Sequence, residues 1–455
     1  MLGPRTHLVP PAGPGLDIPR ASSRQQEWID SARALLDDAL VRDLVVEAVS
    51  VASPTGQEAE LAGVLAARLE SLGLEGRYQP IDATQGNATG RLRGIGTGDD
   101  LLLYAPIDTL TTGDPAEDLP LVGGPTLRRD MLATASEEDG FVVGLGASNP
   151  KGHGAAIVAA VDAVRRAGIP LAGDVVIALC AGGMPTENRP LSGLDRRNSG
   201  QGSGAAFFLD RGGWADHAII CKPGWAAHWE EVGLAWFELR VSGTYNYVGS
   251  RHRIPYSNPI VASADVVRDL DAWFLDYAAR WTDGLVAPQG NIGSIDAGWP
   301  HLLSVSPGVC RIRFDLRTNP RMSMMEARRE VAAVVADIAA RHGLEIEWDM
   351  VLSIPGSYTD PDEWIVRSAI ASWEDREGRP HEPIVANSGA TDANILRAHG
   401  IPTARIGMQR AGEGAPLEPD FPRGMNVVEL AEVRRLAETL IHSIVLTCTP
   451  PTEQN

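Results

Sequence analysis

The sequence has few cysteines, no long apolar run and no excess of positive charge. Its four cysteines (Cys180, Cys221, Cys310 and Cys448) stand far apart, and no C-x-x-C pair occurs. Neither a zinc knuckle nor a disulfide framework is therefore indicated. No apolar run reaches the roughly 18 residues that a membrane-spanning helix needs. At a net charge of −19 and a pI of about 5.0, the surface suits neither nucleic acid nor an anionic membrane.

The composition is that of an ordinary soluble globular protein, with 44% hydrophobic and 22% charged residues. The first twenty residues are rich in proline and glycine and contain no continuous apolar core. We therefore expect neither a signal peptide nor a membrane anchor, and we expect a cytoplasmic protein. A chain of 455 residues exceeds one ordinary hydrophobic core and predicts two domains.

Strand-like and helix-like segments alternate in the first half of the chain. Residues 26–74 predict two amphipathic helices separated by the break at Ser53-Pro54-Thr55-Gly56. A further helix is predicted over Gly154–Ala167, and buried strands are predicted at Leu101–Tyr104, Val175–Cys180 and His217–Cys221. This alternation predicts an α/β fold, a doubly wound and mostly parallel sheet with helices on both faces.

The middle of the chain has a different order of segments. Strands are predicted at Leu234–Val241, Asn291–Ala297 and Val309–Thr318, and helices at Asn258–Trp281 and Ser323–His342. This order predicts a small α+β layer with helices on one face. We therefore expect a flexible arm (1–25), an α/β domain in two pieces (26–230 and 353–449), and an inserted α+β domain (231–352).

Six segments, in this order, carry a family resemblance. They are SPTGQE (53–58), the strand ending in Asp108, GLGASNPKGHGAA (144–156), RIRFDLRTNP (311–320), GATDANILRAHGIPTARIG (389–407) and GMNVVEL (424–430). The chain resembles the superfamily of di-zinc aminoacylases, acetylornithine deacetylase, succinyl-diaminopimelate desuccinylase and glutamate carboxypeptidase, the M20-like peptidases. The resemblance implies a zinc-exopeptidase-like fold with an inserted lid and dimerisation domain. It also implies hydrolysis of an amide, in which two zinc ions activate water and a Glu takes its proton.

This chain departs from the family pattern at the metal positions. The first His is Pro106, the bridging Asp of S-D-x-K-G is Asn149, and the Glu-Glu pair falls on Gly182-Gly183. The Glu of the E-P pair is Lys222, and the last His aligns near Arg423. These residues are poor zinc ligands at neutral pH, so we expect no metal and no cofactor.

The resemblance also implies substrate-binding positions and a homodimer. The His that reaches the partner's site maps near Tyr247, the Asn of N-x-x-P maps to Ser304, and Arg317 keeps the family's arginine. Thr391 and Asp392 lie in the matched GATDA segment. Family dimers pair through an edge strand and an outer helix, which match Leu234–Val241 and Asn258–Trp281.

Cationic side chains are candidates to replace the zinc charge. Lys222 and Arg423 could stabilise an anionic substrate or an oxyanion. A lysine at the carboxyl end of a strand in an α/β sheet points into the usual ligand crevice. The alternative for Lys222 is a solvated strand end or an ion pair with Asp108. The carboxylates considered as a general base are Asp108 and Glu187, the latter in a polar loop.

The segment Ser148-x-x-Lys151 opens a helix and offers a second possible chemistry. A serine with a nearby lysine can act as nucleophile and base, although the family carries both residues without such a role. His153 is a candidate general acid or base, and its alternative is a polar residue bonded to the backbone at a helix start. Cys180 and Cys221 are expected to be buried and inert.

Three functions remain open from the sequence. The first is a metal-independent enzyme that acts on an amide or related carbonyl bond of a small carboxylate-bearing substrate. The second is a non-catalytic homologue that binds a small acidic ligand or a partner protein. The third is a zinc-dependent amidohydrolase with divergent ligands.

Overall fold

The computed structural model describes residues 16–186 and 200–450, and its contacts divide the chain into two compact units. The inserted unit consists of Glu230–Tyr358 and the short segment Ile384–Ala390. The main unit consists of the described residues up to Trp229, Thr359–Pro383, and the chain from Thr391 onward. These units are defined by contacts within the chain. The domain boundaries expected from the sequence stay a prediction.

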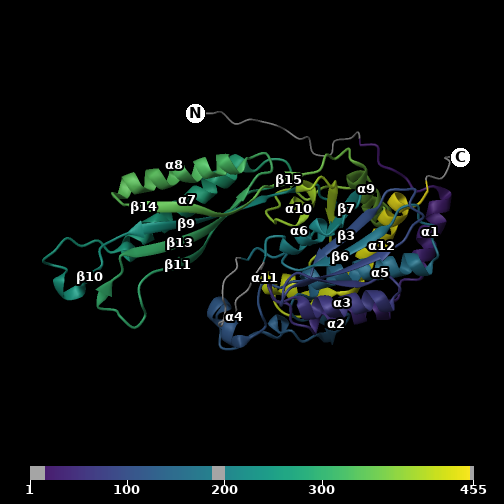
Figure 1. Cartoon of the computed structure of the whole chain (residues 1–455), viewed down its shortest axis with the longest axis horizontal. Coiled ribbons are helices and arrows are strands. Elements are labelled where there is room, and N and C mark those ends of the chain that lie inside the picture. The colour runs from purple at the N-terminus through teal and green to yellow at the C-terminus, as the bar shows by residue number, and fades with distance from the viewer. Residues whose placement is uncertain (1–15, 187–199, 451–455) are drawn as a thin grey trace. The chain divides into compact units, whose positions relative to one another are not determined.

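The main unit contains most of the helices and the larger sheet (Figure 1). Its helices are α1 (Ser23–Ala34), α2 (Asp38–Val49), α3 (Ala59–Ser71), α4 (Pro115–Val122), α5 (His153–Arg166), α6 (Ser203–Asp210), α9 (Trp364–Glu377), α10 (Ala393–Ala398), α11 (Phe421–Asn426) and α12 (Leu430–Cys448), with a short helical segment η2 (Ala147–Gly152). Its strands are β1 (Arg77–Pro80), β2 (Gly86–Leu92), β3 (Leu101–Pro106), β4 (Ser136–Glu138), β5 (Phe141–Val143), β6 (Val175–Cys180), β7 (His217–Cys221), β16 (Thr403–Ile406) and β17 (Val427–Glu429).

The larger sheet has the order β1-β2-β6-β3-β7-β16 within the described chain. Strands β6, β3, β7 and β16 run parallel, and β2 and β1 join antiparallel at one edge. Strands β3, β6 and β7 are apolar along nearly their whole length, as expected for parallel strands that are covered on both faces. The predicted α/β fold with a mostly parallel sheet is confirmed.

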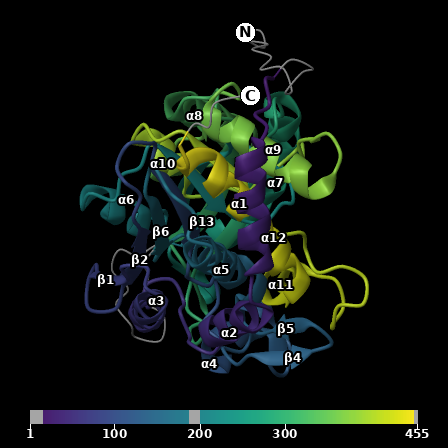
Figure 2. The ribbon, with the colours of Figure 1, turned by 90° about the vertical axis from the view of Figure 1, so that its right-hand side faces the viewer.

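Helices cover both faces of this sheet (Figure 2). On one face α6 and α10 pack through Phe208, Ala393 and Leu396 against Tyr104 and Ile220 of the strands. Helix α5 contacts β3 and β6, and α12 packs along α5. Burial of α5 is nearly complete, because every residue from His153 to Val164 is buried. This core fixes the carboxyl ends of the parallel strands, where the predicted site residues lie.

The inserted unit is a four-stranded antiparallel sheet with two long helices (Figure 1). Its elements are β8 (Glu230–Glu231), β9 (Gly233–Ser242), β10 (Asn246–Tyr247), α7 (Pro259–Trp281), β11 (Gly290–Asp296), β12 (Val305–Ser306), β13 (Val309–Thr318), α8 (Met324–His342), β14 (Ile346–Ile354) and β15 (Ser357–Tyr358). Apolar residues that alternate along β9 and β13 pack against both helices, for example Phe237 and Phe314. Ser323 and Glu326 form a capping box at the start of α8.

Two sequence expectations about elements are wrong. Residues 26–74 form three helices rather than two, because the side chain of Asp37 accepts the backbone N–H groups of Ala39 and Leu40 and starts α2. The strand matched to the family's edge strand is interior, since the sheet order is β11-β13-β9-β14. The edges of this sheet are β11 and β14. Among the described residues, no helix is long and apolar enough to cross a membrane.

Candidate functional site

The predicted site residues of the main unit gather at the carboxyl ends of its parallel strands. Asp108 follows β3, Gly183 follows β6 and Lys222 follows β7. Asn149 lies in η2, directly before α5. In an open α/β sheet, the carboxyl ends of the strands are where ligands bind.

Asp108 holds the loop that follows β6. Its Oδ1 accepts the N–H of Gly183 (2.9 Å), and its Oδ2 accepts the N–H of Met184 (2.9 Å) and the hydroxyl of Thr55 (2.7 Å). Burial raises the pKa of Asp108, while these hydrogen bonds and the charge of Lys222 oppose the rise. Both oxygens of Asp108 are therefore engaged in holding the backbone.

Glu58 lies beside Asp108 and binds the same loop. Its Oε1 accepts the N–H groups of Gly56 (2.9 Å) and Gly182 (3.0 Å). Its Oε2 is buried and has no hydrogen-bond partner among the described residues. Burial, reinforced by the negative charge of Asp108, raises the pKa of Glu58 to about 8. At neutral pH this side chain is therefore mostly a neutral carboxylic acid.

Lys222 stands between the amide of Asn149 and two carboxylates. Its Nζ lies 3.5 Å from Oδ1 of Asn149, whose Nδ2 donates to the sulfur of Met425 (3.3 Å). The positive charge of Lys222 lowers the pKa of Asp108 and of Asp392, which burial otherwise raises. Lys222 thus occupies a negative environment, and much of its charge is balanced within the protein.

Asp392 is paired with a tyrosine of the central strand. Its Oδ2 accepts the hydroxyl of Tyr104 at 2.6 Å. Its Oδ1 accepts no hydrogen bond from the described residues. Burial raises the pKa of Asp392 to about 6, and Lys222 and Tyr104 limit the rise. This carboxylate therefore changes its charge close to neutral pH.

Both ring nitrogens of His153 are engaged with the backbone. Nδ1 lies 2.8 Å from the carbonyl oxygen of Ser148, and Nε2 accepts the N–H of Met408 (3.3 Å). This arrangement fits the neutral ring with its proton on Nδ1. Burial, together with the charge of Lys222, lowers the pKa of His153 to about 3. The geometry matches the backbone-bonded alternative considered for this residue.

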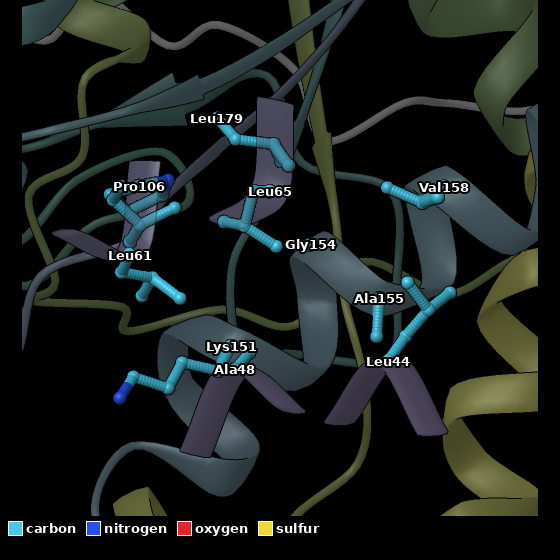
Figure 3. A pocket seen from close by; sticks show the side chains of 11 residues that line it. Leu44, Ala48, Leu61, Leu65, Pro106, Lys151, Gly154, Ala155, Val158 and Leu179 are labelled. Atoms are coloured by element: carbon cyan, nitrogen blue, oxygen red, sulfur yellow. The ribbon is translucent and has the colours of Figure 1, made fainter. Parts of the chain in front are cut away.

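Lys151 and Lys222 are the only two lysines in the sequence, and both are buried, with exposed fractions of 3% and 5%. The Nζ of Lys151 donates to the carbonyl oxygen of Val51 (2.8 Å), and burial lowers its pKa to about 7. Lys151 also lines a cavity of about 10 Å³, in which it is the only charged side chain (Figure 3). No hydrogen bond joins Lys151 to the buried Ser148.

Arg423, in α11, is buried and bonded to the backbone. Its Nη2 donates to the carbonyl oxygens of Ala411 (2.9 Å) and Gly412 (2.6 Å). Its Nε is buried without a hydrogen-bond partner among the described residues. The guanidinium therefore keeps one N–H group that could donate to a ligand. Helix α11 lies beside Asn149, because its Met425 accepts a hydrogen bond from that amide.

The remaining predicted residues lie elsewhere or cannot be placed. Tyr247, Ser304 and Arg317 belong to the inserted unit, where Arg317 forms an ion pair with Asp315 (2.9 Å) and Ser304 accepts the N–H of Val248 (2.8 Å). The hydroxyl of Thr391 accepts the N–H of Ala393 (3.3 Å), the first residue of the short helix α10. Glu187 lies outside the described residues.

With this geometry in view, the family can be tested. A model of peptidase family M20/M25/M40 matches residues 102–431. The chain belongs to this family. It is 27% identical over 333 residues to a succinyl-diaminopimelate desuccinylase from Leptothrix cholodnii, covering 70% of this chain and 79% of that one. It is 25% identical over 421 residues to the same enzyme from Xanthomonas oryzae pv. oryzae, covering 89% and 99%.

Solved structures share the family fold. The di-peptidase Dug1p from Saccharomyces cerevisiae superposes with a TM-score of 0.67 at 12% identity, covering 94% of this chain and 99% of that one. Human carnosine dipeptidase 1 gives a TM-score of 0.64 at 15% identity, covering 94% and 100%. These likenesses bear on the fold alone. The family match and the desuccinylase relatives point to a hydrolase of the amidohydrolase and peptidase type.

The M20 family implies two zinc ions, and the side chains at the positions that the sequence resemblance assigns to their ligands do not fit them. Pro106 and Gly183 offer no donor atom, Asn149 offers an amide, and Lys222 and Arg423 are cations. Within residues 16–186 and 200–450, no three His, Cys, Asp or Glu side chains gather as a group that could hold a metal ion.

Two residues of the cluster were not named from the sequence as site residues. Glu58 belongs to the matched SPTGQE segment, where its position in the motif was a usable signal. Tyr104 carried no signal, because a tyrosine inside an apolar strand is ordinarily a core residue. The expectation that Cys180 and Cys221 are buried is confirmed.

Proposed function

We propose that this M20 family member is a metal-independent hydrolase that cleaves an amide or related carbonyl bond in a small carboxylate-bearing substrate. The observation that carries the proposal is the position of Lys222. It is buried and lies 3.5 Å from the amide of Asn149. The sequence resemblance assigns both positions to metal-ligand residues of the family. A fixed ammonium at this position can stabilise the oxyanion that forms when water attacks a carbonyl.

Asp392 is the carboxylate that we propose as general base. Its pKa of about 6 leaves it ionised at neutral pH, and its Oδ1 is not committed to another described residue. Asp108, the base considered first from the sequence, uses both oxygens to hold Gly183 and Met184. In the proposed reaction Asp392 takes a proton from water, water adds to the carbonyl carbon, and the proton passes to the leaving amine.

A non-catalytic ligand-binding role is the second candidate, and one observation favours it. Lys222 is accompanied by Asp108 and Asp392, so the cluster carries no net positive charge at neutral pH. His153, with both nitrogens bonded to the backbone, offers no ready proton acceptor. A protein that only binds a ligand needs the shape of the site, and it does not need a general base.

The experiment that separates these candidates is an amidase screen on the purified chain. N-acyl amino acids, N-succinyl amino acids and dipeptides are offered with and without a chelator, and bound metal is measured on the same sample. Turnover that survives the chelator, with well under one zinc per chain, supports the proposal. Binding without turnover favours the second candidate. Two zinc ions lost together with activity would establish the zinc-dependent alternative.

We also propose that the protein is a cytoplasmic homodimer. The four cysteines are all free and buried, which suits a reducing compartment. The available surfaces for pairing in the inserted unit are the edge strands β11 and β14 and the outer helices α7 and α8, since β9 is interior. Its proposed partners are a small-molecule substrate and a second copy of the chain, and neither a nucleic acid nor a membrane.

A further inference from the structure

A cavity of about 280 Å³ lies at one end of the four-stranded sheet of the inserted unit. Its lining includes Tyr245, Asp296, Trp299, Leu302, Pro307 and Arg311. All residues of the cavity belong to Glu230–Tyr358, so it is contained in one unit. Small-molecule pockets begin at roughly 300 Å³, so this volume suits one small molecule rather than a peptide.

Two aromatic side chains form the walls of the cavity and remain exposed. Tyr245 is 68% exposed and Trp299 is 60% exposed, and Leu302 adds apolar surface beside them. Covering a side chain of this size removes apolar area from water and contributes on the order of 2 kcal/mol. Exposed aromatic surface at a cavity is therefore a favourable contact for an apolar group of a ligand.

One acidic and one basic side chain complete the lining. Asp296 of β11 stands directly opposite Arg311 of β13 in the antiparallel register. Among the described residues, neither side chain forms an ion pair or a side-chain hydrogen bond. Arg313, two residues further along β13, is by contrast bound to Glu238 (2.8 Å). The cavity thus offers a carboxylate and a guanidinium that are both available to a ligand.

Two other polar groups of the lining are already engaged. The hydroxyl of Ser306 donates to the carbonyl oxygen of Thr244 (2.7 Å), and the carbonyl of Gly308 accepts the N–H of Gly243 (2.9 Å). The charged groups that the lining offers to a polar ligand are Asp296 and Arg311. Because they carry opposite charges and stand side by side, they complement a ligand that also carries one charge of each sign.

We propose that this cavity binds a free α-amino acid with an apolar side chain. Arg311 receives its carboxylate, Asp296 receives its ammonium group, and the side chain packs between Tyr245 and Trp299. A guanidinium binds a carboxylate through two parallel hydrogen bonds, which gives the orientation. The proposal does not depend on whether the main unit is catalytic.

Calorimetric titration of the full chain with L-phenylalanine and L-leucine tests the ligand class. The matched probes are 3-phenylpropionate, which lacks the ammonium group, and phenethylamine, which lacks the carboxylate. We expect each probe to bind at least about tenfold more weakly than L-phenylalanine, since one charged contact is lost. Equal affinities for all three, or no heat from either amino acid at concentrations of about 10 mM, would overturn the proposal.

Single substitutions test the cavity itself. Arg311→Gln, Asp296→Asn and Trp299→Ala are each expected to weaken L-phenylalanine binding by about tenfold or more. Arg313→Gln is the matched control, because this arginine lies on the same strand without lining the cavity, and it should change affinity less than about twofold. All three cavity residues are exposed, and circular dichroism verifies folding. Unchanged affinity in these variants, or a Trp299→Ala change that instead dissociates a dimer, rejects the amino-acid site.

Discussion

The ring of Pro106 fills the space that a side chain at residue 183 would need. A Cβ built on Gly183 would lie 2.3 Å from Cβ of Pro106 and 2.8 Å from Oδ2 of Asp392. The sequence resemblance assigns these two positions to a zinc ligand and to the Glu-Glu pair. Pro106 and Asp392 therefore leave no room for a side chain at residue 183.

This contact predicts a strong coupling between the two positions. Gly183→Ala should lower the free energy of unfolding by about 1–3 kcal/mol, because the added methyl group overlaps the proline ring. Pro106→Gly removes the Cβ that lies 2.3 Å away and should relieve part of that loss, although Asp392 remains close. Urea unfolding of the two single variants and the double variant measures the coupling. Strictly additive effects would contradict the prediction.

The control for this series is Gly63→Ala in helix α3. A Cβ at Gly63 meets no atom within 4 Å. Replacing a glycine inside a helix by alanine stabilises it by about 1 kcal/mol when no clash opposes the change. Glycine to alanine is therefore expected to raise the free energy of unfolding at residue 63 and to lower it at residue 183.

Lys222 is the sharpest test of the proposed chemistry. Lys222→Met keeps the apolar stem and removes the charge, and Lys222→Ala removes both. Each variant should lose turnover by about a hundredfold or more if the ammonium stabilises the oxyanion. Loss of this positive charge should also raise the pKa of Asp392 above its present value of about 6, so the acid limb of the pH–rate profile should move to higher pH.

The Lys222 variants can be interpreted only if they are folded. Circular dichroism and urea unfolding show whether each variant is folded at the assay temperature. If Lys222→Met is folded and keeps near-normal turnover, the ammonium is a structural counter-ion for Asp108 and Asp392, and the proposed role fails. A methionine variant that is active beside an inactive alanine variant would point to packing rather than charge.

Glu58 predicts a pH dependence of stability. Burial raises its pKa from 4.5 to about 8, so between these values the folded state holds a proton that the unfolded state has lost. Stability is therefore greatest below about pH 4.5 for this group and falls as pH rises through about 8. The slope from one proton is at most about 1.4 kcal/mol per pH unit.

Glu58→Gln removes this titration and keeps an oxygen to accept the N–H groups of Gly56 and Gly182. The variant should therefore show a flatter loss of unfolding free energy between about pH 5 and pH 8 than the parent chain. Glu60→Gln, on the exposed face of the same helix, should reproduce the parent's slope. Parallel curves for Glu58→Gln and the parent would show that Glu58 is ionised in the folded state.

A two-fold dimer predicts a mass twice the 48.5 kDa of the chain at micromolar concentration. Light scattering coupled to size exclusion measures it. Charge inserted on an edge strand, for example Ile292→Lys in β11, should dissociate a dimer that pairs through this edge. Because Ile292 packs partly against the core, Ile295→Lys at an exposed position of the same strand is the companion variant. A monomer in the parent chain rejects the dimer.

Sequence patterns located the strands better than they located helix breaks or strand order. His217–Cys221 and Val309–Thr318 were predicted to the residue, because an unbroken apolar run and a strict alternation each leave one solution. The break at Asp37 was missed, since apolar residues continue on both sides of it. Alternation along β9 shows which face is buried, yet it does not show that the strand has neighbours on both edges.

Residues of this cluster were named from the sequence where they stand at motif positions, and were not named where only long-range contacts place them there. Asp108, Asn149 and Asp392 were named from matched segments and Lys222 from the family's E-P pair, and in the folded chain Lys222 interacts with each of the other three. Tyr104 reaches Asp392 across 288 positions of sequence, a contact that only folding creates. The engagement of His153 by two backbone groups likewise depends on the neighbouring turn and on β16.

The burial of both lysines gives this protein an unusual chemical surface. Every other strongly basic side chain in the sequence is an arginine, so in the folded chain an amine-directed acylating reagent meets no exposed lysine. Acylation of Lys151 or Lys222 then requires that the cluster open to solvent. The rate of that labelling, followed by peptide mass, measures how often the site opens and whether a bound ligand keeps it closed.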